Sequence, residues 1–225
     1  MCGRFTYRLT WPEIVWLYQL PLDIPARDTQ PRYNIYPAST IDAVVGREGK
    51  RELVPMRWGL VPAWWSRPLK SMKVATFNAS AETVAEEAMF RSAFERSRCL
   101  IPATGYYEWH GAQPYYITRA DGEPITIAGL WDEWKDKATG ERIKSCTMII
   151  TKANMFVADV HDRMPVILEQ DHFEPWLAGA GNELMKPAAN DVLQRWPVSK
   201  RVNRSRASDD GATLIDRVEV ESAAA

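Results

Sequence analysis

Apolar residues near the N-terminus recur at the spacing of an α-helix. Thr10 and Glu13 form a capping box, and the apolar residues after them share one face, so we expect a helix over residues 10–20. A second helical pattern covers residues 83–98, where apolar side chains lie one turn apart. Two shorter helices are predicted, one beginning near residue 171 and one covering residues 190–194.

Alternating apolar and polar residues indicate strands through most of the remaining chain. The predicted strands are residues 41–45, 51–56, 99–101, 106–110, 115–119, 125–130, 145–151, 198–202 and 213–215. Several are joined by short turns that contain Gly49, Gly122 or Gly140, and connections this short pair neighbouring strands antiparallel. The pattern predicts an α+β fold, with a single domain over residues 1–221 and a disordered tail at 222–225.

Length and composition narrow the class of protein. The chain has 225 residues, 46% of them apolar, which excludes a disordered polypeptide and is enough to bury a sizeable core. No apolar run reaches the roughly 18 residues of a membrane helix, and the N-terminus lacks the pattern of a signal peptide. We therefore expect a cytoplasmic protein with no membrane partner.

The net charge conceals an asymmetry along the chain. Its 28 basic and 29 acidic side chains give a net charge of −1, which by itself argues against binding to nucleic acid. Residues 1–80, however, hold 11 basic and 6 acidic side chains and carry +5, so the remainder carries −6. Two stretches contain basic residues without acidic ones: Arg67, Lys70 and Lys73, and Arg195, Lys200, Arg201, Arg204 and Arg206. Either stretch suits a solvated surface or a contact with DNA phosphates.

The three cysteines differ in their expected roles. Cys2, Cys99 and Cys146 lack the close spacing of a zinc site or redox motif, so we expect no metal and no other cofactor. Cys99 and Cys146 lie in apolar strands and are expected to be inert core thiols. Removal of Met1 would give Cys2 an α-amine and a thiol on adjacent carbons. Such an aminothiol condenses with an aldehyde to a thiazolidine, and its reference pKa values of about 8 to 8.5 leave reactive fractions near neutral pH.

Short motifs follow one another along nearly the whole chain. They are MCGRF at 1–5, PRYNI at 31–35, WGLVP at 58–62, Trp64-Trp65, Asn78-Ala79, Glu82-Thr83, CLIPATGYYEW at 99–109, GLW at 129–131, HDRMP at 161–165, WPVS at 196–199 and Val202-Asn203. In this order they resemble the SRAP (SOS response-associated peptidase) family of abasic-site processing proteins. The resemblance implies a barrel-like antiparallel sheet with peripheral helices.

The resemblance also implies a function. Cys2, as the mature N-terminus, would link covalently to the ring-opened aldehyde of an abasic deoxyribose in single-stranded DNA and shield the lesion. It implies a lyase-type crosslinking activity, autopeptidase removal of Met1, contact with replication or repair proteins, a monomeric state and association with the nucleoid. Two other hypotheses stay open: a self-processing N-terminal-nucleophile peptidase, and a module that binds single-stranded DNA without a covalent bond.

Three residues are implied as partners of Cys2 in the site: Asn78, Glu108 and His161. Strand alternation places Glu108 on one face with Tyr106, and a carboxylate among aromatic side chains tends to have a raised pKa that suits proton exchange. His161 can act as acid and base near neutral pH, and the Asn78 amide can orient a sugar or an amine. Each also has a purely structural alternative: an edge-strand glutamate facing water, a histidine satisfied by hydrogen bonds, and a loop or cap asparagine.

Side chains near these motifs are the predicted DNA contacts. Arg4 and Arg163 each lie two residues from a site residue and are expected to hold phosphates beside the lesion. Trp64, Trp65 and Arg67 combine aromatic rings with basic charge, and at most one of the two tryptophans is easily buried. The tryptophans assigned to the core are Trp16, Trp131, Trp134 and Trp176.

The chain departs from the family pattern at Ser80. The family usually has Asn-Ala-Arg-x-Glu where this chain has Asn-Ala-Ser-Ala-Glu at residues 78–82. A serine can donate one hydrogen bond to a phosphate but brings no charge. The departure therefore bears on DNA affinity and its salt dependence.

Overall fold

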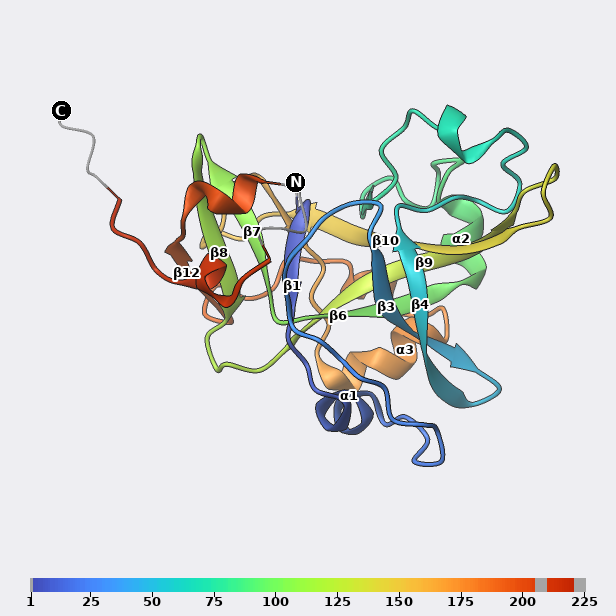
Figure 1. The fold of residues 1–225 in the computed structure, drawn as a ribbon, viewed down its shortest axis with the longest axis horizontal. Helices are drawn as coiled ribbons and strands as arrows, with labels where there is room; N and C mark the ends of the chain where they lie inside the picture. The colour runs from blue at the N-terminus through green and yellow to red at the C-terminus, as the bar shows by residue number, and fades with distance from the viewer. Residues whose placement is uncertain (1, 205–209, 221–225) are drawn as a thin grey trace.

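Two β-sheets lie side by side and form the frame of the protein (Figure 1). The computed structural model describes residues 2–204 and 210–220, so Arg206 and the predicted tail at 222–225 lie outside the described residues. The first sheet has the strand order β12-β8-β7-β1-β2. Its strands are β1 (Arg4–Tyr7), β2 (Arg32–Ile35), β7 (Gly105–His110), β8 (Gln113–Arg119) and β12 (Leu193–Pro197).

The second sheet closes into a barrel, as predicted. Its strands are β3 (Thr40–Arg47), β4 (Lys50–Trp58), β5 (Asn78–Ser80), β6 (Arg98–Ala103), β9 (Ile125–Lys135), β10 (Arg142–Lys152) and β11 (Arg163–Pro165). The order β10-β4-β3-β6-β9 is closed by a pairing of β9 with β10, and β5 and β11 add to β10. The strands joined by short turns pair antiparallel, as predicted, whereas β10 runs parallel to β4 and to β5, to which longer connections join it.

The first helix and the central strands are confirmed. Helix α1 (Trp11–Tyr18) begins at the predicted capping box, in which the Thr10 backbone N–H donates to the Glu13 carboxylate at 2.7 Å. The hairpin around Gly49 forms as β3 and β4, and β6 to β10 follow the predicted alternation.

The helix predicted over residues 83–98 is wrong except at its end. Only α2 (Arg91–Arg96) is helical, and residues 81–90 form successive turns. The Ala81 N–H donates to the carbonyl of Ile150 at 2.8 Å. This bond holds the segment against the barrel as it leaves β5. Beyond it, the Glu86 N–H donates to the Thr83 carbonyl and the Phe90 N–H to the Glu87 carbonyl, both at 2.9 Å, a spacing of three residues that is typical of turns and not of an α-helix.

The predictions beyond residue 190 are also wrong. Residues 190–194 lead into β12, which pairs with β8, in place of a helix. The strands predicted at 198–202 and 213–215 are the 3₁₀ helices η4 (Lys200–Asn203) and η5 (Ala212–Ile215). Each of these 3₁₀ helices buries one apolar side chain without a partner strand. The buried side chain is Val202 in η4 and Leu214 in η5.

The other helices are short. They are η1 (Leu69–Ser71), η2 (Gln170–His172), α3 (Phe173–Leu177) and η3 (Asn182–Leu184). The helical segment predicted to begin near residue 171 is thus confirmed as η2 and α3. Among the described residues, no helix is long and apolar enough to cross a membrane.

The core holds most of the residues assigned to it. Cys99 and Cys146 are fully buried, and burial raises the pKa of both thiols, as expected of inert core cysteines. Trp134 and Trp176 are buried. The assignment of Trp16 to the core is wrong, since its side chain is 71% exposed on the solvent face of α1.

Candidate functional site

Cys2 lies where the two sheets meet. It precedes β1 of the first sheet, and its side chain is fully buried. The Asn78 side-chain Nδ2 donates to the backbone carbonyl of Cys2 at 3.0 Å. Because Asn78 begins β5 of the barrel, this hydrogen bond attaches the N-terminal residues of one sheet to the other.

The Cys2 thiol is held in its protonated form. Burial raises its pKa well above the usual value, and the carboxylate of Glu108 adds to the shift. The expectation of an appreciable thiolate fraction near neutral pH is therefore wrong for this structure. Nucleophilic attack by this sulfur needs a group that takes the thiol proton.

Glu108 is a buried carboxyl group whose charge acts on the Cys2 thiol. It lies in β7, between β1 and β8, and is 1% exposed, so the alternative of an edge-strand glutamate facing water is wrong. Burial raises its pKa to about 7, and the nearby carboxylate of Asp162 also favours the neutral form. A carboxyl group with this pKa exchanges protons readily at neutral pH.

Tyr106 belongs to the same buried cluster. It lies two residues before Glu108 on the same face of β7 and pairs across the strands with Phe5 of β1. Burial raises the pKa of its hydroxyl, with smaller contributions from Cys2 and Glu108, so this group stays neutral. The three side chains therefore share one electrostatic environment.

His161 lies just before β11 and is neutral at physiological pH. Burial lowers its pKa below the usual value, against the opposing effect of Asp162. Its Nδ1 accepts the backbone N–H of Arg163 at 3.0 Å, which leaves the proton of the neutral ring on Nε2. Asp162 Oδ1 lies 2.9 Å from the same Nδ1 and would accept its proton in the charged ring.

Only the nitrogen of the Asn78 side-chain amide has a hydrogen-bond partner among the described residues. Its Nδ2 is bonded to Cys2, whereas its Oδ1 is buried and has no hydrogen-bond partner among the residues that the structure describes. A buried acceptor without a partner is costly unless a ligand supplies a donor. The Oδ1 atom is thus available to a hydroxyl or an amine next to Cys2.

Arg163 is engaged with two neighbours of Asn78 along the chain. Its Nη2 donates to Ser80 Oγ at 2.9 Å and to the Glu82 carboxylate at 2.7 Å. The pair with Arg163 lowers the pKa of Glu82 to about 2, so the carboxylate is ionised at any ordinary pH. Ser80, at the position of the family arginine, therefore contacts Arg163 itself.

Arg4 is tied to the C-terminal segment. Its guanidinium donates to Asn34 Oδ1 at 2.8 Å and to the backbone carbonyls of Asn203 and Arg204 at 3.2 and 3.1 Å. These contacts fasten β1 and β2 to the chain beyond η4. The phosphate contact expected of Arg4 stays a prediction.

The two adjacent tryptophans point to different environments. Trp65 is buried, and its carbonyl accepts the indole N–H of Trp134 at 2.6 Å, whereas Trp64 is 52% exposed. The prediction that at most one of them is buried is confirmed. The Arg67 guanidinium lies 4.5 Å from the centre of the Trp65 ring, so an exposed indole and a cation occur on one loop.

Two residues of the C-terminal basic stretch are engaged within the protein. Arg195 forms two bonds with the Asp159 carboxylate, at 2.5 and 2.7 Å. The Arg201 guanidinium donates to Thr213 Oγ1 at 3.0 Å. For these two residues, the structural alternative accounts for the basic charge.

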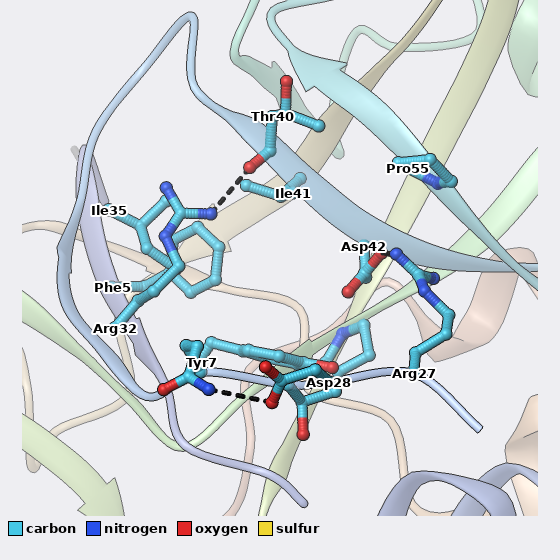
Figure 2. A pocket seen from close by; sticks show the side chains of 13 residues that line it. Phe5, Tyr7, Arg27, Asp28, Arg32, Ile35, Thr40, Ile41, Asp42 and Pro55 are labelled. Carbon is cyan, nitrogen blue, oxygen red and sulfur yellow. Dashed lines mark hydrogen bonds and ion pairs between the residues drawn. The ribbon is translucent and has the colours of Figure 1, made fainter. Parts of the chain in front are cut away.

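A separate cavity of about 250 Å³ opens beside β1, β2 and β3 (Figure 2). Its charged side chains pair with the protein: Arg27 lies 3.0 Å from Asp42, and Arg32 donates to the carbonyl of Thr40 at 2.7 Å. The pair of Arg27 with Asp42 holds the loop over residues 27–30 against the barrel. None of the predicted site residues lines this cavity.

Two residues near the site had no predicted role. Asp162 contacts His161 and helps to raise the pKa of Glu108, and Glu82 binds Arg163. Both belong to motifs that were recognised in the sequence. No group of three or more His, Cys, Asp or Glu side chains able to hold a metal ion occurs within residues 2–204 and 210–220.

Comparison with known proteins gives a consistent result. The profile of the SOS response associated peptidase (SRAP) family matches residues 1–205. The chain is 33% identical to abasic site processing protein YoaM of Bacillus subtilis (strain 168), over 96% of this chain and 98% of that protein. It is 30% identical to abasic site processing protein YedK of Escherichia coli (strain K12), over 97% and 100%.

Solved structures agree with this result. The crystal structure of a protein from Bacteroides thetaiotaomicron has a TM-score of 0.83 and 25% sequence identity with this chain, covering 97% of this chain and 100% of that one. The fold and the sequence thus lead to the same assignment. The chain belongs to the SRAP family.

Proposed function

We propose that this protein processes abasic sites by forming a covalent bond between Cys2 and the ring-opened deoxyribose in single-stranded DNA. The names of its relatives, abasic site processing proteins, support the substrate class. The observation that carries the proposal is the placement of Glu108, a buried carboxyl group with a pKa of about 7, in the same electrostatic environment as Cys2. A protein that processes abasic sites would associate with DNA in the cell.

The proposed reaction begins when Met1 is removed, because until then the Cys2 nitrogen is an amide and is not nucleophilic. The free α-amine adds to the aldehyde carbon of the open sugar and forms a carbinolamine, which loses water to give an imine. The thiol sulfur then bonds to the imine carbon, and its proton is transferred to the imine nitrogen. One aldehyde and one aminothiol thus give one thiazolidine and one water.

The environment of the thiol sets the order of these steps. Since burial keeps the Cys2 thiol protonated, the amine attacks first and the thiol closes the ring second. Glu108 as a carboxylate takes a proton from the amine or the thiol, and as a carboxylic acid it returns one to the departing hydroxyl. The pKa of about 7 lets it perform both transfers.

His161 and Asn78 act on the sugar and on the nucleophile. The Nε2–H of neutral His161 is the donor that protonates the ring oxygen as the sugar opens. Asn78 fixes the Cys2 carbonyl through Nδ2, and its Oδ1 can accept a hydrogen bond from the sugar or the amine. Holding the reacting atoms in this way lowers the entropic cost of the bond-forming step.

Contacts with the strand would come from Trp64, Arg67, Arg163 and Ser80. The half-exposed Trp64 indole provides a stacking surface for a base beside the lesion, and Arg67 adds positive charge on the same loop. Ser80 and Arg163 are hydrogen-bonded to each other near Asn78 and would offer polar groups to the DNA strand.

A second proposal concerns the release of Met1. The same buried Glu108 that supports the crosslink lies beside the residue whose amide must be cut, so the chain's own residues are proposed to catalyse that single hydrolysis. Intact-mass measurement of Glu108→Gln, synthesised without cellular aminopeptidases, tests this step. Retention of Met1 in the variant and its loss from the wild type are expected; equal loss from both would assign the step to another enzyme.

The covalent proposal is tested with matched oligonucleotides. The mature protein is incubated with single-stranded DNA that carries one abasic site, or with the same strand undamaged, and the products are resolved under denaturing conditions. An adduct with the abasic strand alone is expected. Binding that is fully reversible and equal for both strands would instead favour a noncovalent DNA-binding module.

A further inference from the structure

Arg163 and Glu82 form an ion pair that is joined by two side-by-side hydrogen bonds. The Arg163 Nη1 and Nη2 atoms donate to the two carboxylate oxygens of Glu82, at 3.0 and 2.7 Å. This is the two-bond arrangement in which an arginine also binds a phosphate group. The residues are 81 positions apart in the sequence, so the pair reflects the tertiary fold.

The remaining donors of Arg163 are also largely engaged. Nη2 further contacts Ser80 Oγ at 2.9 Å and the carbonyl of Ile150 at 3.2 Å. Of the five N–H groups of a guanidinium, only the Nε–H and one Nη1–H then have no partner among the described residues. These two point to opposite sides of the planar group, so a phosphate cannot form two parallel bonds with Arg163 while Glu82 is in place.

The position of Glu82 allows it to be exchanged for another anion. Its side chain is 39% exposed, whereas that of Arg163 is 17% exposed, so solvent reaches the pair from the side of the carboxylate. The carboxylate is ionised at ordinary pH and cancels the charge of Arg163. Ser80 adds no compensating positive charge at the neighbouring position.

We propose that Glu82 sets the affinity for single-stranded DNA by occupying the phosphate-binding edge of Arg163 until a backbone phosphate displaces it. This inference rests on the proposed contact between Arg163 and the DNA strand. Glu82 acts as an internal competitor, so Arg163 contributes to binding only in exchange for its ion pair. Strand binding is thereby weaker and less dependent on salt than the number of basic residues suggests.

The test measures reversible binding of an undamaged fluorescent oligonucleotide at several salt concentrations, so that no aldehyde is present. Glu82→Gln is expected to bind about fivefold more tightly than the wild type, which corresponds to about 1 kcal/mol. Its plot of log K against log salt is expected to be steeper by about 0.7, the value for one more neutralised phosphate on a single strand.

Glu86→Gln is the matched control, because it removes the same charge four residues away on an exposed side chain. It is expected to change neither affinity nor salt slope by more than a small fraction of the Glu82→Gln effect. In an Arg163→Gln background, Glu82→Gln is expected to behave like the control, since the edge it would release is gone. Glu82→Asp keeps the charge but shortens the side chain, and is expected to tighten binding to a smaller extent.

Weaker binding by Glu82→Gln, or equal effects of Glu82→Gln and Glu86→Gln, would overturn the inference. Absence of binding by all variants would overturn it as well. Adduct formation with an abasic strand is measured in parallel for each protein. If the binding results overturn the inference and an adduct still forms, the proposed function stands and only the role of Glu82 fails. If the adduct is lost as well, the proposed function has failed.

Discussion

The side-chain amide of Asn78 donates a hydrogen bond to the backbone carbonyl of Cys2 at 3.0 Å. This bond joins the barrel to the first sheet and fixes the residue whose amine and thiol are the proposed nucleophiles. Asn78 Oδ1 is buried without a partner among the described residues, so the same amide can still accept one hydrogen bond.

Asn78→Ala is expected to slow adduct formation by roughly 10- to 100-fold, since a small displacement of a nucleophile costs about that much. The measurement is the single-turnover rate with an abasic oligonucleotide in excess. Thermal unfolding serves as the control, and a change of only a few degrees is expected. A variant that reacts at the wild-type rate would remove Asn78 from the proposed site.

The pKa of Glu108 predicts the pH dependence of the reaction. As a base, Glu108 must be ionised, so the rate of adduct formation is expected to rise with pH through a step near 7. A further rise is expected up to about pH 8 as the α-amine loses its proton. Glu108→Gln is expected to lose this step in the profile and to react roughly 100-fold more slowly or worse. An unchanged step near pH 7 in the variant would assign the titration to another group.

The same group makes a prediction for stability. The pKa of Glu108 is higher in the folded protein, about 7, than in an unfolded chain, about 4.3, so the folded state binds its proton more tightly. The contribution of this group is fully present below about pH 4.3 and is lost as the pH rises to about 7.

Urea unfolding of the wild type and Glu108→Gln between pH 5 and pH 8 measures this difference. The wild type is expected to lose stability relative to the variant by up to about 1.4 kcal/mol per pH unit below pH 7, with no further relative change above it. A difference that stays constant over this range would mean that Glu108 has an ordinary pKa.

Truncation of the two adjacent tryptophans is expected to affect different properties, the stability of the protein for Trp65 and DNA binding for Trp64. Trp65→Ala removes a buried ring and is expected to lower the free energy of unfolding by about 3–5 kcal/mol. Trp64→Ala removes a half-exposed ring and is expected to change stability little but to weaken single-strand binding by about 1–3 kcal/mol. Equal strand affinity for Trp64→Ala and the wild type would exclude Trp64 as a stacking surface.

The sequence predicted the local features of the fold well. The capping box of α1, the hairpin around Gly49 and the face of β7 that carries Glu108 all follow from spacing within a few residues. The helix over residues 83–98 failed before residue 91 because successive turns there bury Val84 and Phe90, and the spacing of apolar residues along the sequence does not distinguish such turns from a helix. The strands expected after residue 197 failed because short turns bury their apolar side chains.

The site was predicted as a set of residues but not as an arrangement. The bond between Asn78 and Cys2 and the pair of Glu82 with Arg163 join positions that are 76 and 81 residues apart, and no periodicity indicates such contacts. The protonated state of the Cys2 thiol likewise depends on complete burial, which the second position of a chain does not suggest. The family resemblance suggested the residues, and the structure supplies hydrogen bonds and charge states for them.

The central claim is that both nucleophiles of Cys2 react with one abasic aldehyde. Intact-mass spectrometry of mature wild type and of Cys2→Ala, each incubated with an abasic oligonucleotide with and without borohydride, tests it most directly. The wild type is expected to gain the mass of the oligonucleotide less one water without any reductant, whereas Cys2→Ala, which retains only an amine, is expected to give a stable adduct solely after reduction. A wild-type adduct that also requires borohydride, or equal unreduced adducts from both proteins, would contradict the thiazolidine.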